Sequence, residues 1–133
     1  MMVLDASAAI ELLLGSTKGV EVASHVSLAS SVLAPQLIDV EVLQVLRRLE
    51  ASKVLSKRRA QEALDDFRAL DVVRYDHEPL LDRIWALRGN VSAYDATYVA
   101  LAESADATLV TCDARLGTLR GAKEKIVVVA DAG

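Results

Sequence analysis

Short apolar runs recur along the chain, and segments with helical periodicity separate them. The runs contain Val, Leu, Ile and Ala with little alternation between apolar and polar positions, which is typical of strands buried on both faces of a parallel sheet. Turn residues and charged residues bound each run. We therefore expect strands at "MMVLD", "SVLAP", "DVVRYD", "ATLVT" and "KIVVVA", which are residues 1–5, 31–35, 71–76, 107–111 and 125–130.

The segments between these runs have the spacing and the boundary residues of helices. Ser7 is placed to cap the first helix, and Gly15 stands where a left-handed C-terminal turn would end it. Apolar residues recur every three to four positions in "QLIDVEVLQVLRRLEAS", and Ser56 precedes the next helix. The predicted helices span 7–15, 16–26, 36–52, 57–70, 77–89 and 92–104.

Alternation of strands and helices predicts an α/β protein with three layers, α/β/α. Its centre would be a parallel sheet of four or five strands, with both faces covered by helices. With 133 residues, the chain has the length of a single domain, which we expect to span 1–133. Ligands of such sheets bind at the carboxyl ends of the strands, near the point where strand order reverses.

Composition indicates what kind of core the protein has and in which compartment it works. Hydrophobic residues make up 53% of the chain and aromatic residues only 4%, so the core must consist mainly of aliphatic side chains. No apolar run reaches the length of about 18 residues that a membrane helix needs, and no secretory leader is recognisable. The single cysteine, Cys112, rules out an internal disulfide framework, so we expect a cytoplasmic protein.

Acidic residues stand where the predicted strands end. Asp5 follows the first strand, and Asp113 comes two residues after the end of "ATLVT". Asp95 lies in the first turn of the helix before that strand, while Asp39 and Glu41 lie near the start of the helix after "SVLAP". These carboxylates should gather at one edge of the sheet.

Each acid also has a purely structural interpretation. Ser92 and Asp95 have the spacing of a capping box, and Asp5 and Asp113 could be ordinary cap or turn residues. Glu41 could be a solvated residue near a helix N-terminus. Together, however, converging carboxylates raise one another's pKa unless a cation neutralises them. Oxygen ligands without His or Cys suit Mg²⁺ or Mn²⁺, which can activate water and bind a phosphate.

Other catalytic chemistries have little support in the sequence. His25 and His77 have no partner motif, Cys112 has the pattern of a small packed thiol, and no glycine-rich phosphate loop is present. A phosphatase with an aspartate nucleophile would need a second Asp where Ser7 stands. A phosphoacceptor receiver domain would need an acid next to Asp5, where Ala6 stands, and a lysine where Cys112 follows the strand.

Four motifs, in this order and spacing, resemble the PIN-domain ribonucleases, and among these the VapC toxins of toxin–antitoxin pairs. They are "VLDASAAIELLLG", "APQLIDVEVLQVL", "SAYDATYVALAE" and "LVTCDARL", and the resemblance extends from Val3 to Val129. The third and fourth motifs together are the most specific. The resemblance implies a PIN-like fold, a homodimer, and a VapB-type antitoxin that occludes the pocket.

The resemblance also implies roles for individual residues. It identifies an acidic quartet that holds Mg²⁺ or Mn²⁺ and performs catalysis, with two hydroxyls beside it that orient carboxylates and water. Helical periodicity does not separate Asp39 from Glu41, but the family glutamate lies six residues after the proline, as Glu41 does after Pro35, so Asp39 is assigned to solvent. Gln44 stands where relatives commonly have Asn. The quartet is Asp5, Glu41, Asp95 and Asp113, and the hydroxyls are Ser7 and Thr111.

The charge pattern is compatible with an RNA substrate such as tRNA or rRNA. The formal net charge is −4, but without the quartet 15 acidic residues face 15 basic ones. Basic residues cluster, and they could contact RNA phosphates or form a solvated helix face paired with nearby acids. The resulting expectation is a metal-dependent endoribonuclease toxin; the alternative is a catalytically inactive PIN-fold binding domain. The candidate RNA contacts are Arg47, Arg48, Lys57, Arg58 and Arg59.

Overall fold

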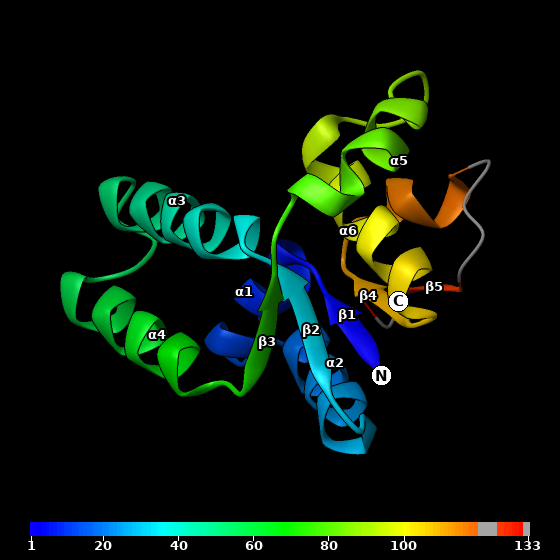
Figure 1. Cartoon of the computed structure of the whole chain (residues 1–133). Helices are drawn as coiled ribbons and strands as arrows, with labels where there is room; N and C mark the ends of the chain where they lie inside the picture. The colour runs from blue at the N-terminus through cyan, green and yellow to red at the C-terminus, as the bar shows by residue number, and fades with distance from the viewer. Residues whose placement is uncertain (120–124, 132–133) are drawn as a thin grey trace.

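A parallel five-stranded sheet forms the centre of the protein in the computed structural model, which describes residues 1–119 and 125–131 (Figure 1). The strand order is β3-β2-β1-β4-β5, and every neighbouring pair is parallel. The three-layer fold class is confirmed, with five strands. These are β1 (Met2–Leu4), β2 (Val32–Pro35), β3 (Val72–Tyr75), β4 (Thr108–Thr111) and β5 (Ile126–Val128).

Strand order reverses between β1 and β4. The chain adds β2 and β3 on one side of β1, and then crosses back to place β4 and β5 on the other side. Leu4 of β1 lies opposite Val110 of β4, and the Asp5 N–H donates to the Val110 carbonyl at 3.3 Å. The residues that follow β1 and β4 are therefore neighbours at the position where open α/β sheets bind ligands.

Helices cover both faces of the sheet. α5 and α6 lie on one face, and α1 and α2 lie on the other (Figure 1). The helices are α1 (Ala6–Leu14), α2 (Thr17–Leu28), α3 (Leu37–Ala51), α4 (Lys57–Ala69), α5 (Leu81–Ala86) and α6 (Ala93–Ala105), and the 3₁₀ turns are η1 (Glu78–Leu80) and η2 (Ala114–Thr118).

Aliphatic side chains of the central strands form the core. Val3 and Leu4 of β1 and Leu109 of β4 are fully buried. The whole stretch from Ala96 to Ala102 in α6 is buried as well, because its alanines let the helix lie close to β1, β2 and β4. A helix buried on nearly all sides can position a side chain of its first turn rigidly over the sheet edge.

The start of α1 differs from the sequence expectation. Ser7 was predicted to cap this helix, and that prediction is wrong: Asp5 is the N-cap, and its Oδ1 accepts from the Ala8 N–H at 2.9 Å. Ser7 lies inside the first turn. The shift follows from the short β1, which ends at Leu4 and lets the helix begin at once. Gly15 ends α1 in the left-handed conformation, with φ of 67°, as predicted.

The helix predicted at 77–89 is shorter in the structure. Residues Glu78–Leu80 form the 3₁₀ turn η1, which contains Pro79, and α5 continues only to Ala86. The Leu87 N–H then donates to the carbonyls of the last turn of α5, and this closes the helix before Gly89.

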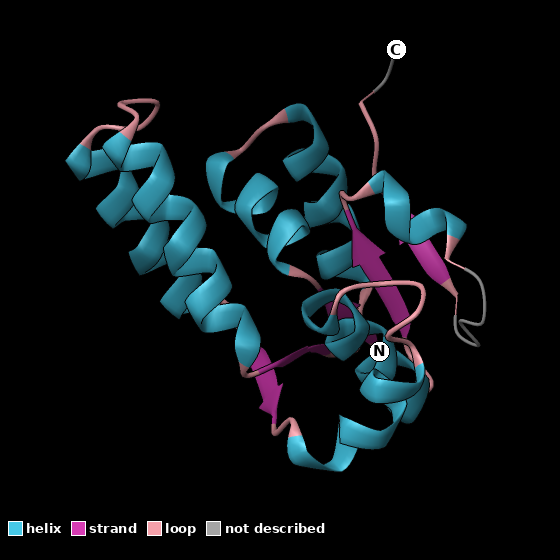
Figure 2. Ribbon diagram, turned by 90° about the horizontal axis from the view of Figure 1, so that it is seen from above, coloured by secondary structure: helices cyan, strands magenta, loops and turns pink. Residues whose placement is uncertain are grey.

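α3 and α4 extend away from the sheet as an antiparallel pair (Figures 1 and 2). α3 begins directly after β2, so only its first turns lie beside the sheet edge. At 15 residues it is the longest helix between residues 1 and 119 or 125 and 131, and within these ranges no helix is long and apolar enough to cross a membrane.

Candidate active site

The four predicted acids line one pocket at the switch point of the sheet. They come from four different segments: the β1–α1 junction, the second turn of α3, the first turn of α6 and the β4–η2 junction. The pocket has a volume of about 330 Å³. Its lining is Asp5, Ala6, Ser7, Glu41, Gln44, Val45, Arg48, Asp95, Tyr98 and Asp113.

Asp5 occupies the floor of this pocket and is held by neutral donors. Only 4% of it is exposed. Its Oδ1 accepts from the Ala8 N–H at 2.9 Å and from the Ser7 hydroxyl at 2.7 Å, and its Oδ2 accepts from the Thr111 hydroxyl. With both oxygens engaged, the carboxylate has one fixed orientation.

Ser7 and Thr111 connect the two loops that meet at the switch point. The Ser7 Oγ accepts from the Cys112 N–H at 2.9 Å, and the Thr111 Oγ1 accepts from the Asp113 N–H at 3.0 Å. Each hydroxyl thus donates to Asp5 and accepts from the chain beyond β4. This arrangement fixes the start of α1 relative to the start of η2.

Glu41 reaches the pocket from α3, where Tyr98 of α6 binds it. The Tyr98 hydroxyl donates to Glu41 Oε1 at 2.5 Å. Tyr98 is fully buried, and it lies on the same face of α6 as Asp95, three residues away. The hydrogen bond therefore links the projecting helix α3 to the buried helix α6 across the pocket.

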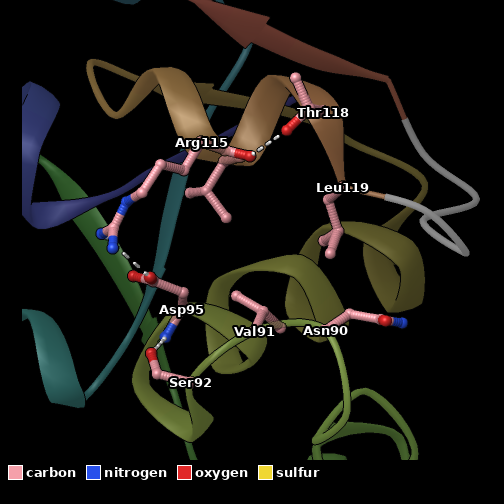
Figure 3. Close-up of a pocket in the computed structure, with 8 residues that line it drawn as sticks. Asn90, Val91, Ser92, Asp95, Arg115, Thr118 and Leu119 are labelled. Carbon is pink, nitrogen blue, oxygen red and sulfur yellow. Dashed lines mark hydrogen bonds and ion pairs between the residues drawn. The ribbon is translucent and has the colours of Figure 1, made fainter.

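Asp95 and Asp113 form the outer part of the pocket, and Arg115 binds both. Arg115 donates to both oxygens of Asp113, with Nη2 to Oδ2 at 2.6 Å and Nε to Oδ1 at 3.0 Å. Its Nη2 also lies 3.9 Å from Asp95 Oδ2 (Figure 3). Asp95 is also tied to its own helix, because its N–H donates to the Ser92 hydroxyl at 3.2 Å. Ser92 is therefore the N-cap of α6, as predicted.

The surroundings shift the acidities of these groups in opposite directions. Burial raises the pKa of Asp5 to about 6, although its three hydrogen bonds oppose the shift. Burial also raises the pKa of Glu41 and of Asp95, and the neighbouring Asp113 charge adds to the shift at Asp95. Hydrogen bonds from Arg115 lower the pKa of Asp113. Three of the four carboxyls are thus short of compensating positive charge.

The donor set suits a hard divalent cation. Carboxylate oxygens are the ligands that Mg²⁺ and Mn²⁺ prefer, and a cation would relieve the unfavourable burial of the acids. Within residues 1–119 and 125–131, however, no three His, Cys, Asp or Glu side chains stand in a geometry that would hold an ion. Arg115 and Tyr98 engage Asp113 and Glu41 instead.

Asp39 lies outside this pocket, in agreement with its assignment, but it is not merely solvated. It forms an ion pair with Arg74 of β3, whose Nε lies 2.8 Å from Asp39 Oδ1. His77 serves a structural purpose as well, because its Nε2 accepts from the Leu37 N–H at the start of α3. Burial raises the pKa of the Cys112 thiol to about 11, which leaves it a poor nucleophile.

The five residues of the basic cluster lie in three different settings. Arg48 lines the acid pocket from α3. Arg58 forms an ion pair with Glu62, and Arg59 binds both Glu62 and the Leu13 carbonyl. Arg47 and Lys57 line a separate groove between α3 and α4. Only Arg48 of the five therefore lies at the acids.

Sequence reasoning missed Tyr98 and Arg115. Tyr98 follows Asp95 by three residues, a spacing that places both side chains on one helix face. Arg115 follows Asp113 by two residues, and this neighbouring opposite charge is a signal that the sequence does contain. Neither spacing by itself predicts the Tyr98–Glu41 hydrogen bond or the Arg115–Asp95 ion pair, because these depend on how α3 and η2 approach α6.

The sequence pattern of the PIN domain family matches residues 2–121. The chain belongs to the PIN-domain family. Among curated PIN-domain relatives, Ribonuclease VapC9 of Mycobacterium tuberculosis is 42% identical over 97% of this chain and 98% of its own length. Ribonuclease VapC12 of the same species is 37% identical over 98% of this chain and 100% of its own length.

Solved structures share the PIN fold at low sequence identity. One is VapBC2 from Rickettsia felis, solved bound to a DNA fragment from the VapBC2 promoter. The superposition with it has a TM-score of 0.69 and 14% identity, and it includes 96% of this chain and 97% of the Rickettsia chain. VapC20 of M. tuberculosis, a sarcin-ricin loop cleaving toxin, covers 86% of this chain and 91% of that chain with a TM-score of 0.63 and 15% identity.

Proposed function

We propose that this protein is an endoribonuclease of the VapC type that hydrolyses RNA phosphodiester bonds with the help of Mg²⁺ or Mn²⁺. The observation that carries the proposal is the convergence of Asp5, Glu41, Asp95 and Asp113 on one pocket at the switch point of the sheet. Similarity to ribonucleases over almost the whole chain supports the same activity. RNA is the proposed substrate, and the cytoplasm is where such a protein would act.

The four acids would hold the cation, which supplies an activated water and neutralises charge on the scissile phosphate. Asp5 would provide a carboxylate of fixed orientation, because the Ser7 and Thr111 hydroxyls and the Ala8 N–H hold it. Tyr98 orients Glu41, and Arg48 offers positive charge for RNA phosphates at the pocket wall.

We also propose that a VapB-type antitoxin is the natural partner. Solved relatives include VapBC complexes from Rickettsia felis and Salmonella typhimurium. An Arg or Lys of the partner, placed in the acid pocket, would compensate the buried carboxylates much as Arg115 compensates Asp113. The homodimer implied by the resemblance stays a prediction.

The first test is cleavage of total cellular RNA by the purified protein, freed of any partner, with Mg²⁺ or Mn²⁺ and with EDTA. Discrete fragments should appear only with metal and should disappear in Asp95→Asn. Asp39→Asn is the matched control, because Asp39 is an acid of the same helix as Glu41 that points to Arg74. Cleavage that persists in EDTA or in Asp95→Asn would refute the assignment. Failure of a folded protein to cleave with either metal would favour a binding-only domain.

A further inference from the structure

A second cavity lies directly beside the acid pocket and shares Asp95 with it. Its volume is about 450 Å³. That is within the range of small-molecule sites, which begins at roughly 300 Å³. The start of α6 and the turn before it form one wall, and η2 forms the other (Figure 3). Its lining is Asn90, Val91, Ser92, Asp95, Arg115, Leu116, Thr118 and Leu119.

Three apolar side chains, Val91, Leu116 and Leu119, line this cavity together with five polar residues. Val91 and Leu119 lie on opposite walls (Figure 3), and both are partly exposed. Asn90 belongs to the lining as well, and its side-chain amide makes no hydrogen bond within residues 1–119 and 125–131. A lining that combines apolar side chains with hydrogen-bonding groups fits the flat face and polar edge of a nucleobase.

Arg115 stands at the boundary between the two cavities. Its side chain is 83% exposed, and its charge is held by Asp113 and Asp95. A guanidinium binds a phosphate in the same bidentate way as a carboxylate, so Arg115 can exchange Asp113 for an RNA phosphate without leaving its position. Release of Asp113 would also make that carboxylate available to a cation.

We propose that this second cavity is the subsite for one nucleotide of single-stranded RNA next to the scissile phosphate, with Arg115 as the ligand of the adjoining phosphate. The proposal rests on the proposed ribonuclease function, because the acid pocket defines where the scissile phosphate lies. Unpaired RNA is the occupant because only a splayed base can enter such a cavity, whereas a base within a duplex stays stacked. The cavity would then select the base that flanks the cut.

The test fills the cavity with Val91→Trp, and the control is Val20→Trp on α2, where Val20 is 65% exposed and outside both cavities. A pool of single-stranded RNA with randomised sequence is cleaved, and the bases on each side of the cut are read by sequencing. Val91→Trp should lose the base preference at one flanking position and keep the others. If Val91→Trp keeps the same base preference as the unmodified protein and Val20→Trp, the proposed subsite is wrong.

Binding separates failure of the subsite from failure of the ribonuclease assignment. In an Asp5→Asn background, fluorescein-labelled RNA octamers of the four homopolymers report affinity without cleavage. Arg115→Gln should weaken binding several-fold and lower the salt slope by about 0.7 per lost phosphate contact, and Arg115→Lys should restore part of both. Absence of cleavage by the unmodified protein would count against the enzyme, whereas octamer binding that is unchanged by Arg115→Gln and by Val91→Trp would count against the subsite.

Discussion

The inner and outer halves of the acid pocket are held together in different ways. In the inner half, neutral hydroxyls and a backbone N–H hold Asp5, and the group is buried. In the outer half, an exposed guanidinium holds Asp113. Neutral donors leave the buried charge uncompensated, so the pKa of Asp5 rises to about 6, while the cation lowers the pKa of Asp113. The inner half is a fixed framework, and the outer half is an exchangeable ion pair.

Removal of the inner charge gives the largest expected effect. Asp5→Asn should lower the cleavage rate by about 100-fold or more, since loss of a group that only hydrogen-bonds to a metal ligand already costs 10–100-fold. Without metal, the Asp5→Asn variant should nevertheless be more stable than the unmodified protein at pH 8. The folded state holds the Asp5 proton more tightly than the unfolded chain, whose pKa is near 3.8. The free energy of unfolding therefore falls as pH rises from about 4 to about 6, by about 3 kcal/mol.

Urea unfolding in EDTA across pH 4–8 measures this contribution. Asp5→Asn should remove the part of the decrease that Asp5 contributes, and Glu41 and Asp95, whose pKa values burial also raises, should contribute what is left. Asp39→Asn is the control, because Asp39 carries the same charge on the surface and should leave the decrease in place. An Asp5→Asn variant that is destabilised at pH 8 would show that the carboxylate is compensated within the folded protein after all.

Loss of a hydroxyl in the inner half should have the next largest effect. Thr111→Val keeps the shape of the side chain but removes the donor to Asp5 Oδ2 and the acceptor for the Asp113 N–H. We expect a cleavage rate about 10–100-fold lower and a loss of about 1–3 kcal/mol in stability. Thr108→Val, at the start of the same strand, is the control. Retention of the full rate by Thr111→Val would mean that Ser7 and Ala8 suffice to orient Asp5.

The exchangeable outer half predicts a gain in place of a loss. Arg115→Gln removes the cation that competes for Asp113, so the affinity of the RNA-free protein for Mn²⁺ should increase about two- to five-fold, as expected for an exposed ion pair. Titration of Mn²⁺ followed by electron paramagnetic resonance measures it. Arg58→Gln, which breaks the ion pair with Glu62 on α4, is the control. Weaker Mn²⁺ binding by Arg115→Gln would show that Arg115 supports the ion site instead of competing with it.

Surface charge near the pocket should have the smallest effect. Arg48→Gln should lower the salt slope of RNA binding by about 0.7, since Arg48 lines the acid pocket. Arg58→Gln should leave the slope unchanged, because Glu62 already pairs with that guanidinium. Fluorescence anisotropy with one RNA octamer, measured at salt concentrations from about 50 to about 200 mM, distinguishes the two variants. Equal effects of both variants would place the RNA along α4 as well.

The sequence determined the fold class, the five strands and the acids that follow them. Apolar runs without alternation can be satisfied only by a sheet covered on both faces, and such a sheet gathers the residues after its strands at one edge. The resemblance then selected Glu41 over Asp39, which helical periodicity leaves equivalent. These conclusions depend on patterns between residues that are close in sequence, and such patterns can be recognised without a structure.

Only the tertiary structure decided how the acids are held. Asp5 caps α1 in place of Ser7, and this frees the Ser7 hydroxyl to join the β1 and β4 loops. Tyr98 binds Glu41 from 57 residues away, and Arg115 reaches across to Asp95. Such contacts depend on the distance between helices that are remote in sequence, which in turn depends on how alanine-rich α6 packs on the sheet. The sequence showed that the four acids would converge, and packing decided which of them is neutralised by a partner.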